Sequence, residues 1–510
     1  MKFKKTAAIA AVLLPTLLLA SCGGSAGENA GGEQGRSLTI GMLGDVTSWA
    51  SEDAHVGHGL VPMQAPYDSL LRRDAQGELQ PMLATDWSYD EARTALTLEL
   101  RDDVTFSDGV AFDAEAVKAN LEHFKDDALR QASQLAALDS VEVVDSDTVV
   151  LHLSEPDPAL ELNLSQAAGL MASPEAVGTA EADTVPVGSG PYVMEVESTV
   201  AGSRIVFTAR DDYWAPELQQ YDRVEFRVLE DVSARLNALQ SGQVDATILD
   251  ATTYDQAAGA GFEILEDYQT DWNGFTLFDR DGELNPALAD VRVRQAINYA
   301  VDREALVEQI ERGHGTATTQ PFGPESGAYV DELDDRYPHD PERARELLAE
   351  AGYPDGVTLT VTMLPGWDGM QAAIRQQLSE AGITLTSEPV QFANMFGDIA
   401  QKKYEALHFN LFQSEAWVNV QQLLVENTLY NPFGSTDPEL TGLIDELQSL
   451  SSGEQADAVA QQINEFVVEN AWFVPLYRLD QVIAFDAERV EVVKQPQQAF
   501  PSLYNFAPAA

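Results

Sequence analysis

Segments with the two-residue repeat of a β-strand alternate along this chain with segments that have a helical repeat, in no simple order. In residues 95–100, leucines alternate with polar residues, as on a half-buried strand. Two further segments flank the turn-forming sequence Asp145-Ser146-Asp147, which is typical of a β-hairpin. We expect strands at residues 38–42, 95–100, 141–144, 148–153, 204–208 and 224–229.

The helical segments carry start and stop signals. Asp113, Asp290 and Asp340 each precede an apolar stripe with helical spacing, and aspartate is a favoured N-cap residue. Pro341 suits a first helical position, and Gly352 suits the position after a helix. We expect helices from these caps to Phe124, Ile310 and Gly352, and at residues 375–378 and 455–468. The mixed order predicts an α/β protein rather than a β-sandwich or an all-helical bundle.

Acidic residues greatly outnumber basic ones. The 510 residues include 83 Asp and Glu but only 30 Lys and Arg, which gives a formal net charge of −53. A field of this sign repels phosphate backbones and argues against nucleic-acid binding. It also opposes docking on anionic lipid, so membrane attachment would need a covalent lipid or a hydrophobic segment. The hydrophobic content of 45% is typical of a folded protein, and the length suggests two or three domains.

The only cysteine, Cys22, follows an apolar N-terminal segment. A lone cysteine excludes an internal disulfide and a Cys-rich metal site. Lysines precede residues 7–19, an apolar run too short to span a bilayer comfortably, as in a secretory signal peptide. The sequence Leu19-Ala20-Ser21-Cys22 resembles a bacterial lipobox, which implies a signal peptide at residues 1–21, lipidation of Cys22 and a flexible tether at residues 22–36. The alternative is an ordinary signal peptide beside an incidental cysteine.

Several short motifs follow one another between residues 67 and 353. They are YDSLL at 67–71, PMLATDW at 81–87, FSDG at 106–109, GSGPY at 188–192, DYW at 212–214, VRVRQAINYAVDR at 291–303 and DPERARELL at 340–348 with AGY at 351–353. In order and spacing, this set resembles the extracytoplasmic solute-binding proteins of the peptide/nickel type, family 5 of the ABC-importer binding proteins. The lipobox and the sequence FVPLY at 473–477 agree with that pattern.

Most of these motifs are interpreted as structural. The GSGPY segment lacks the Lys-Ser/Thr ending of a phosphate loop, and Pro191 has no amide donor, so we interpret it as a tight entry into a strand. Asp302-Arg303 is interpreted as a surface or capping pair rather than a catalytic acid. The chain has no His-Glu-x-x-His motif, and its cysteine is assigned to the lipobox. We therefore expect that the protein is not an enzyme and has no catalytic residue or cofactor. The alternatives from other functional classes are a secreted lipoprotein hydrolase and a structural surface lipoprotein.

The resemblance implies a type II periplasmic-binding-protein fold, with two lobes joined by a hinge and an extra subdomain inserted in lobe 1. Mapped onto this chain, lobe 1 comprises residues 37–66, 187–271 and 479–510, the insertion residues 67–186, and lobe 2 residues 272–478. The hinge would lie near Trp272-Asn273-Gly274 and near Tyr477-Arg478-Leu479. The resemblance further implies a monomer that captures a solute by lobe closure and delivers it to ABC permease subunits driven by cytoplasmic ATPases. The protein would sit outside the cell membrane, held only by the lipid on Cys22.

The ligand is expected between the lobes, in contact with loops at strand ends. The loop after the first strand contains Trp49, His55 and His58. The sequence His55-Val56-Gly57-His58 offers two imidazoles that could in principle bind a metal ion. We favour polar contacts within the loop or contacts with the ligand instead, and we assign no metal site. At the lobe junction, Trp272 and Asn273 are candidates, although Trp272 is also expected to fit as a packed hinge residue.

Lobe 2 offers Trp367, Phe412, Ser414, Glu415 and Trp417 as ligand-binding candidates; Trp367 fits a core or lid position equally well. Peptide-binding relatives have the pattern Trp-x-x-Asp-Tyr-x-Asp-Pro in this region, and its Asp pairs with the peptide's α-ammonium. This chain has Ser414-Glu415-Ala416-Trp417 instead, and Glu415 could replace that Asp as the partner of a cation. We therefore expect peptides or another amine-bearing solute, with nickel chelates, haem, glutathione and oligosaccharides as alternatives on the same scaffold.

Overall fold

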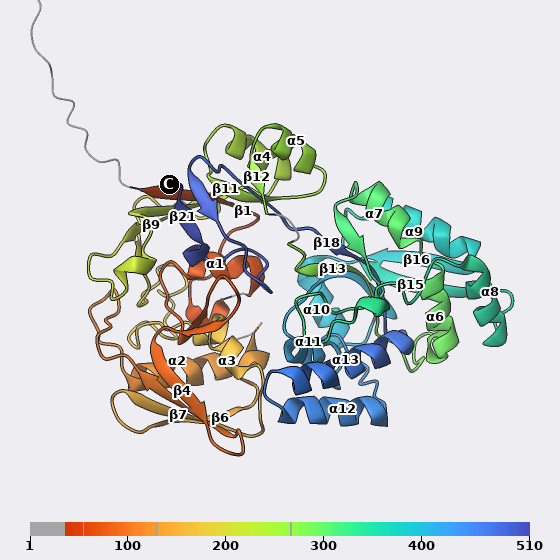
Figure 1. The fold of residues 1–510 in the computed structure, drawn as a ribbon, viewed down its shortest axis with the longest axis horizontal. Coiled ribbons are helices and arrows are strands. Elements are labelled where there is room, and N and C mark those ends of the chain that lie inside the picture. Colours follow the sequence, from red (N-terminus) through yellow and green to blue (C-terminus); the bar gives the residue numbers. More distant parts are fainter. Residues whose placement is uncertain (1–35, 55, 128–130, 266–267) are drawn as a thin grey trace, which may run out of the picture. The chain divides into compact units, whose positions relative to one another are not determined.

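The computed structural model describes residues 36–510, apart from residues 55, 128–130 and 266–267 (Figure 1). The predicted signal peptide, Cys22, most of the tether and His55 therefore lie outside the described residues. Residues 36–510 form one unit by the density of their internal contacts. The strands of this unit are distributed over several sheets, which confirms the expected α/β class.

The largest sheet has seven strands in the order β12-β19-β11-β1-β10-β9-β8. Their bounds are β1 Ser37–Met42, β8 Tyr192–Met194, β9 Arg204–Ala209, β10 Arg223–Val228, β11 Ala246–Leu249, β12 Glu263–Ile264 and β19 Val482–Phe485. The first strand lies between β10 and β11 and runs parallel to both, while the other pairings are antiparallel. Segments from the beginning, the middle and the end of the chain thus share one sheet.

A second sheet has six strands in the order β14-β18-β13-β17-β15-β16. Their bounds are β13 Asp271–Leu277, β14 Gly315–Ala317, β15 Val357–Met363, β16 Ile383–Pro389, β17 Ala406–Phe412 and β18 Phe473–Leu479. The strands β13 and β18 are antiparallel neighbours with a register shift between Asn273 and Gly274. A Cβ atom on Gly274 would lie 2.4 Å from the carbonyl oxygen of Val474, so close packing of β18 requires the glycine.

A third sheet is antiparallel and has the order β4-β5-β7-β6. Its strands are β4 Ala84–Tyr89, β5 Ala95–Leu100, β6 Leu138–Val143 and β7 Thr148–Leu153, and the minor pairs are β2 Leu71–Arg73 with β3 Leu79–Pro81 and β20 Val490–Val492 with β21 Phe506–Pro508. The predicted alternation in β5 is confirmed, because Leu96, Leu98 and Leu100 are buried while Glu99 is exposed. The predicted hairpin is β6 and β7, which pair in register from Val143↔Val149.

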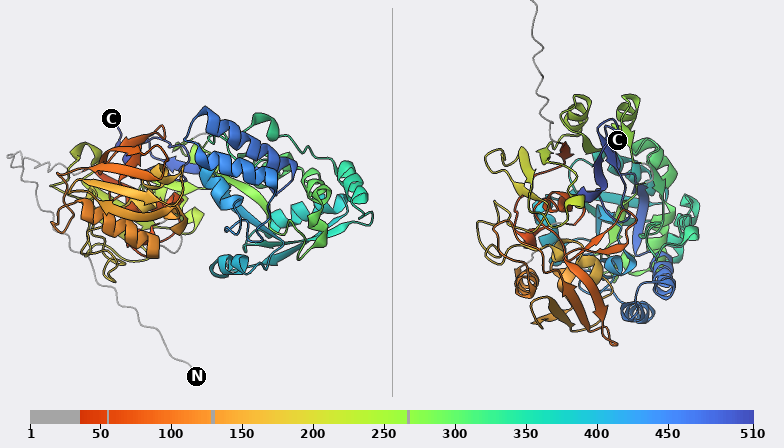
Figure 2. Two further views of the ribbon diagram at one scale, coloured as in Figure 1. Left: turned by 90° about the horizontal axis from the view of Figure 1, so that it is seen from below. Right: turned by 60° about the vertical axis from the view of Figure 1, so that its left-hand side comes forward.

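The helices are α1 Leu60–Met63, α2 Ala114–Asp127, α3 Leu160–Asn163, α4 Val232–Gln240, α5 Tyr254–Gly259, α6 Val291–Tyr299, α7 Arg303–Ile310, α8 Pro341–Glu350, α9 Asp368–Glu380, α10 Phe392–Ala400, α11 Ala416–Leu423, α12 Pro438–Ser449 and α13 Glu454–Glu469. The last two run side by side in both Figure 1 and Figure 2. The predicted caps Asp290 and Asp340 accept hydrogen bonds from the amides of Arg292 and Arg343.

The expected single helix from Asp290 to Ile310 is wrong, because the chain forms two helices there. The carboxylate of Asp302 accepts a hydrogen bond from the amide of Ala305 and starts α7 as a new helix. Arg303 is also not a surface residue: it is buried and donates to the backbone carbonyls of Thr318, Pro475, Asn298 and Tyr337. Burial lowers the pKa of Arg303 to about 9.

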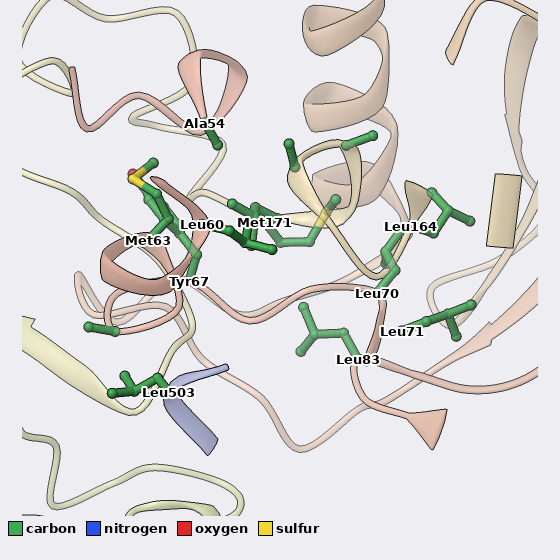
Figure 3. Packing of buried hydrophobic residues seen from close by; sticks show 14 of the residues in the cluster. Ala54, Leu60, Met63, Tyr67, Leu70, Leu71, Leu83, Leu164, Met171 and Leu503 are labelled. Atoms are coloured by element: carbon green, nitrogen blue, oxygen red, sulfur yellow. The ribbon is translucent and has the colours of Figure 1, made fainter. Parts of the chain in front are cut away.

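Three of the motifs that carry the family resemblance, YDSLL, GSGPY and DYW, meet in one buried region. The carboxylate of Asp68 has no exposure and accepts 2.8 Å hydrogen bonds from Tyr213 Oη and Trp214 Nε1. A Cβ atom on Gly190 would lie 2.5 Å from the backbone amide nitrogen of Tyr67, so the chain passes too closely for any side chain. Figure 3 shows the apolar cluster that surrounds Tyr67. These motifs build the scaffold, as interpreted from the sequence.

Candidate ligand-binding site

The strand β1, which lies inside the seven-stranded sheet, ends at a cavity of about 250 Å³, here called the β1 cavity. Residues 40–48 and parts of the segment 53–63 form its walls, and Phe226, Ile248 and Phe500 complete them. The polar residues among its lining are Asp45, Thr47, Ser48, Asp53 and His58. The sequence expectation that the loop after β1 faces a binding space is consistent with this geometry.

His58 is the most unusual group in the β1 cavity. Burial lowers its pKa to about 4, so the imidazole is neutral at neutral pH. Its buried Nε2 has no hydrogen-bond partner within the described residues. The second histidine of the predicted pair, His55, lies outside the described residues, and within them no group of three or more His, Cys, Asp or Glu side chains is arranged to hold a metal ion.

Two smaller cavities meet at Ser414. The first, of about 30 Å³ and here called the amide cavity, is lined by Val56, Gln131, Ser133, Gln134, Asn163, Gln166, Phe412, Ser414, Val418, Gln421 and Gln422. The second, of about 10 Å³ and here called the Gln413 cavity, is lined by Gln269, Thr270, Gly323, Glu325, Ser326, Gln413, Ser414 and Gln497. The predicted site residues Phe412 and Ser414 therefore both line cavities, next to Glu415.

Glu415 lies at the N-terminal end of α11, and its side chain does not cap that helix. Among the described residues, its carboxylate makes no hydrogen bond and no ion pair. Burial raises the pKa of this carboxyl, the charge of Arg73 opposes the rise, and the charge of Glu161 adds to it. The guanidinium of Arg73 already donates to the carbonyl oxygens of Gly77, Pro496 and Gln497.

Trp417 is buried, and its Nε1 donates a 3.2 Å hydrogen bond to the carboxylate of Asp157. Burial raises the pKa of Asp157, while the amide of Ala159 and the indole of Trp417 oppose that rise. The indole therefore has a protein partner, and the edge of its ring is held against the segment that precedes α3.

Trp49 and Trp272 are packed inside the protein. Trp272 has no exposed surface and lies edge-on to Phe473, with ring centroids 5.9 Å apart. Trp49 is 5% exposed and lies edge-on to Phe207 at 5.4 Å, and its carbonyl oxygen accepts a hydrogen bond from Tyr67 Oη. Of the two alternatives for Trp272, the structure places the side chain as a packed residue.

Asn273 belongs to a chain of buried side chains in the six-stranded sheet. Gln371 Nε2 donates to His408 Nδ1 at 2.6 Å, so His408 Nε2 carries the proton and donates to Asn273 Oδ1 at 2.8 Å. Asn273 Nδ2 then donates to Asn410 Oδ1 at 2.6 Å. Burial lowers the pKa of His408 to about 3, and the half-buried ring of Trp367 lies 4.6 Å from the His408 ring.

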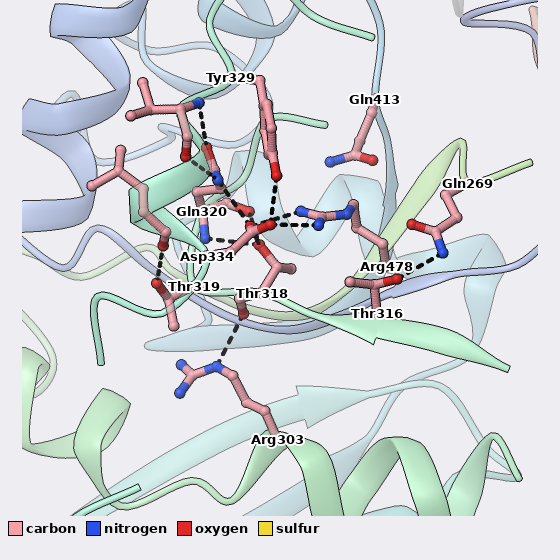
Figure 4. Close-up of polar contacts among 12 residues, drawn as sticks. Gln269, Arg303, Thr316, Thr318, Thr319, Gln320, Tyr329, Asp334, Gln413 and Arg478 are labelled. Carbon is pink, nitrogen blue, oxygen red and sulfur yellow. Dashed lines mark hydrogen bonds and ion pairs between the residues drawn. The ribbon is translucent and has the colours of Figure 1, made fainter. Parts of the chain in front are cut away.

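The second strand at the predicted hinge, β18, ends in an ion-paired network, which Figure 4 shows. Arg478 is 2% exposed and makes bonds of 2.8 and 2.6 Å to the two carboxylate oxygens of Asp334. Asp334 also accepts hydrogen bonds from Thr318 Oγ1, Gln320 Nε2 and Tyr329 Oη. These donors and Arg478 hold the pKa of Asp334 below its ordinary value in spite of its burial.

Sequence reasoning did not identify the carboxamides of the amide cavity. Gln131, Gln134, Asn163 and Gln166 come from one part of the chain and Gln421 and Gln422 from another. Glutamine is common on protein surfaces, and these residues have no characteristic spacing. Only their meeting in the folded chain distinguishes them. Within the part of the chain that the structure describes, no helix combines the length and apolar character needed to cross a bilayer.

The solved structures that resemble this one are binding proteins of ABC transporters and related periplasmic proteins. The binding protein DppA from Helicobacter pylori in complex with the peptide STSA matches with a TM-score of 0.80 at 20% identity, over 94% of this chain and 99% of its own. NikA from Brucella suis in complex with Fe(III)-EDTA matches with a TM-score of 0.80 at 20% identity, over 92% and 99%. The fold is thus the type II periplasmic-binding-protein fold expected from the sequence.

The curated relatives include the glutathione-binding protein GsiB of Escherichia coli K12, which is 29% identical over 391 residues, or 74% of this chain and 72% of its own length. Its counterpart from Salmonella paratyphi A is 32% identical over 334 residues, or 62% of each chain. These relatives are extracytoplasmic substrate-binding proteins of importers rather than enzymes. Residues 78–432 match the family described as bacterial extracellular solute-binding proteins, family 5 Middle. The chain belongs to the family 5 extracellular solute-binding proteins of ABC importers, and it is a binding protein rather than an enzyme.

Proposed function

We propose that this protein captures peptides or another small amine-bearing solute and that Glu415 binds the ligand's ammonium group. The carboxylate of Glu415 carries this proposal, because it is half-buried, directly follows Ser414, which lines two cavities, and lacks an ion-pair partner among the described residues. A buried carboxylate without a partner is costly, and an ammonium group gives it a strong charge-assisted hydrogen bond.

Lobe closure around the ligand fits the arrangement of the sheets. We propose lobe 1 at residues 37–66, 187–271 and 479–510, its inserted subdomain at residues 67–186, and lobe 2 at residues 272–478. The seven-stranded sheet belongs to lobe 1 and the six-stranded sheet to lobe 2, and the chain passes between them beside β13 and β18. The amide cavity, at about 30 Å³, is too small for a dipeptide, so ligand entry would require its walls to separate.

Delivery follows from the family. The closed, loaded protein would dock as a monomer on the transmembrane subunits of an ABC permease, whose cytoplasmic ATPases drive release. The lipid on Cys22 would hold the protein at the outer face of the cell membrane. A Cys22→Ser variant is expected to move from the membrane fraction to the soluble fraction while it keeps its ligand affinity. Retention of this variant in the membrane fraction would contradict lipid anchoring.

Other ligand classes on this scaffold remain defined alternatives. GsiB is named for glutathione, and solved relatives are in complex with Ni(L-His) and with Fe(III)-EDTA. Haem and oligosaccharides complete the set. A thermal-shift screen of the purified protein with tripeptide pools, nickel–histidine, haem, glutathione and sugars separates these classes, because a ligand that binds only the folded state raises Tm.

The Glu415→Gln variant tests the proposed ammonium partner. The substitution keeps the shape of the side chain and removes its charge, so we expect at least a tenfold loss of affinity for the amine-bearing ligand, or about 1.4 kcal/mol. Glu426→Gln is the matched control. It removes the same charge at an exposed position, and unlike Glu415, Glu426 has no sequence neighbour that lines one of the three cavities. Unchanged affinity in Glu415→Gln, measured by isothermal titration calorimetry, would contradict the proposal.

A further inference from the structure

The three cavities share one property, which is that no lysine or arginine lines any of them. Their charged lining residues are the acids Asp45, Asp53 and Glu325, and His58 is neutral at neutral pH. The remaining polar lining consists of carboxamides and hydroxyl groups. Within the described residues, the cavity walls thus contain acceptors for a cation but no cationic partner for a carboxylate.

Several of the carboxamides are free to bind. The side chains of Gln131, Gln421 and Gln422 make no hydrogen bond to the described residues, although all three line the amide cavity. In the Gln413 cavity, the Oε1 atom of Gln413 is buried and has no hydrogen-bond partner among the residues that the structure describes. A carboxamide both donates and accepts, so it matches the alternating N–H and C=O groups of a peptide main chain.

Arg73 interacts electrostatically with Glu415, but its guanidinium already has hydrogen-bond acceptors. Its guanidinium donates to Gly77, Pro496 and Gln497, and its remaining electrostatic attraction is toward acids that include Glu415 and Glu325. A ligand carboxylate placed beside Arg73 would have to displace these backbone acceptors and would face the carboxylate of Glu415. Arg73 is therefore poorly suited to receive it.

We propose that this site recognises its ligand through a free ammonium group and an uncharged, amide-rich body, and that it provides no partner for the ligand's α-carboxylate. This inference rests on the proposed function. The ligand's carboxyl end is amidated, extended beyond the site or left in solvent. Glutathione has two carboxylates and one ammonium group at neutral pH, so it is a poor ligand for such a site. In this respect the protein would differ from the GsiB relatives, which are named for glutathione.

The test uses one random tripeptide pool prepared in four forms: free termini, C-terminal amide, N-terminal acetyl and both modifications. Competition among the pools and glutathione is measured with the purified protein by native mass spectrometry. We expect the amidated pool to bind within threefold of the free pool or more tightly. N-acetylation should weaken binding at least tenfold, and glutathione should bind at least tenfold more weakly than the amidated pool.

A substitution in the cavity wall gives a second measurement. Gln421→Arg introduces a cation where a free carboxamide stands, so the preference for free-acid over amidated peptides should rise about tenfold. Gln462→Arg, an exposed position on α13 outside the cavities, adds the same charge and should leave this preference unchanged.

The outcomes distinguish a failure of this inference from a failure of the proposed function. A tenfold or greater loss on amidation in the unaltered protein shows that a cation holds the ligand's carboxylate, which overturns this inference and leaves the proposed function intact. Failure of all four pools, with a positive thermal shift for another solute, overturns both. Equal response of Gln421→Arg and Gln462→Arg shows that Gln421 does not face the ligand's carboxyl end, which also counts against the inference.

Discussion

Asp68 is a fully buried carboxylate and Glu415 a half-buried one, and they differ in what surrounds them. Asp68 lies in the loop before β2 and receives hydrogen bonds from Tyr213 and Trp214. Glu415 directly follows Ser414, which lines the amide cavity, and receives no hydrogen bond from the described residues. A buried carboxylate whose lone pairs are satisfied fixes the structure, whereas one that is left unsatisfied beside a cavity is available to a ligand.

Asp68→Ala tests the structural side of this comparison and has the largest expected effect. The substitution leaves Tyr213 Oη and Trp214 Nε1 without their acceptor, and each unsatisfied buried donor costs about 1–3 kcal/mol. We expect the free energy of unfolding to fall by about 2–4 kcal/mol, measured by urea denaturation. The folded fraction should keep its ligand affinity; a loss below about 1 kcal/mol would show that Asp68 is not structural in this sense.

The pH dependence of stability should also distinguish Asp68. Burial raises its pKa to about 6, from its ordinary value of 3.8. Between these pH values the folded state holds a proton that the unfolded state has lost, so this group's contribution to stability falls as pH rises from about 4 to 6. Over that window the protein should lose up to about 3 kcal/mol relative to an Asp68→Asn variant.

Two buried histidines also make stability depend on pH, in the direction opposite to Asp68. Measuring the protein against the Asp68→Asn variant removes their contribution. The pKa values of His58 and His408 lie near 4 and 3, below their ordinary value, so their contributions are lost as pH falls below about 6.5. Both histidines are present in the two proteins, and their effects cancel in the difference. A difference that stays constant from pH 4 to pH 6.5 would contradict the raised pKa of Asp68.

Glu415→Gln tests the other side of the comparison, and we expect it to have the smallest effect on stability. Since its carboxylate has no hydrogen-bond or ion-pair partner within the described part of the chain, neutralising the side chain should leave the free energy of unfolding of the ligand-free protein unchanged within about 0.5 kcal/mol, or raise it. Thermal and urea unfolding without ligand provide the measurement. Destabilisation of more than about 1 kcal/mol would place Glu415 with Asp68 as a structural carboxylate.

The scaffold was predictable from the sequence because its signals are local. Strand alternation at residues 95–100 and the caps Asp290 and Asp340 correspond to elements of the structure. The break at Asp302 was missed, because the apolar stripe continues in phase through it while the aspartate starts a second helix. The ordered motifs identified the family, since the family's pattern depends on residues such as Asp68 and Gly190 that hold the core together.

The candidate site was only partly predictable. Glu415 stood out because it departs from the pattern of peptide-binding relatives, and Ser414 and Phe412 were named for their position beside it. Trp49 and Trp272 were named for their predicted positions, in the loop after the first strand and at the lobe junction. Their burial depends on partners, Phe207 and Phe473, that are distant in sequence. The carboxamides of the amide cavity meet only through tertiary structure and have no local signal.

The hydrogen bonds that link Gln371, His408, Asn273 and Asn410 all run in one direction. Gln371 donates to His408, His408 to Asn273 and Asn273 to Asn410, so the orientation of one amide fixes the proton position on the imidazole and the orientation of the others. A single change would leave two donors or two acceptors face to face. Homologues should therefore exchange these four residues together or keep them all, and surveys of natural variants should find intermediate combinations depleted.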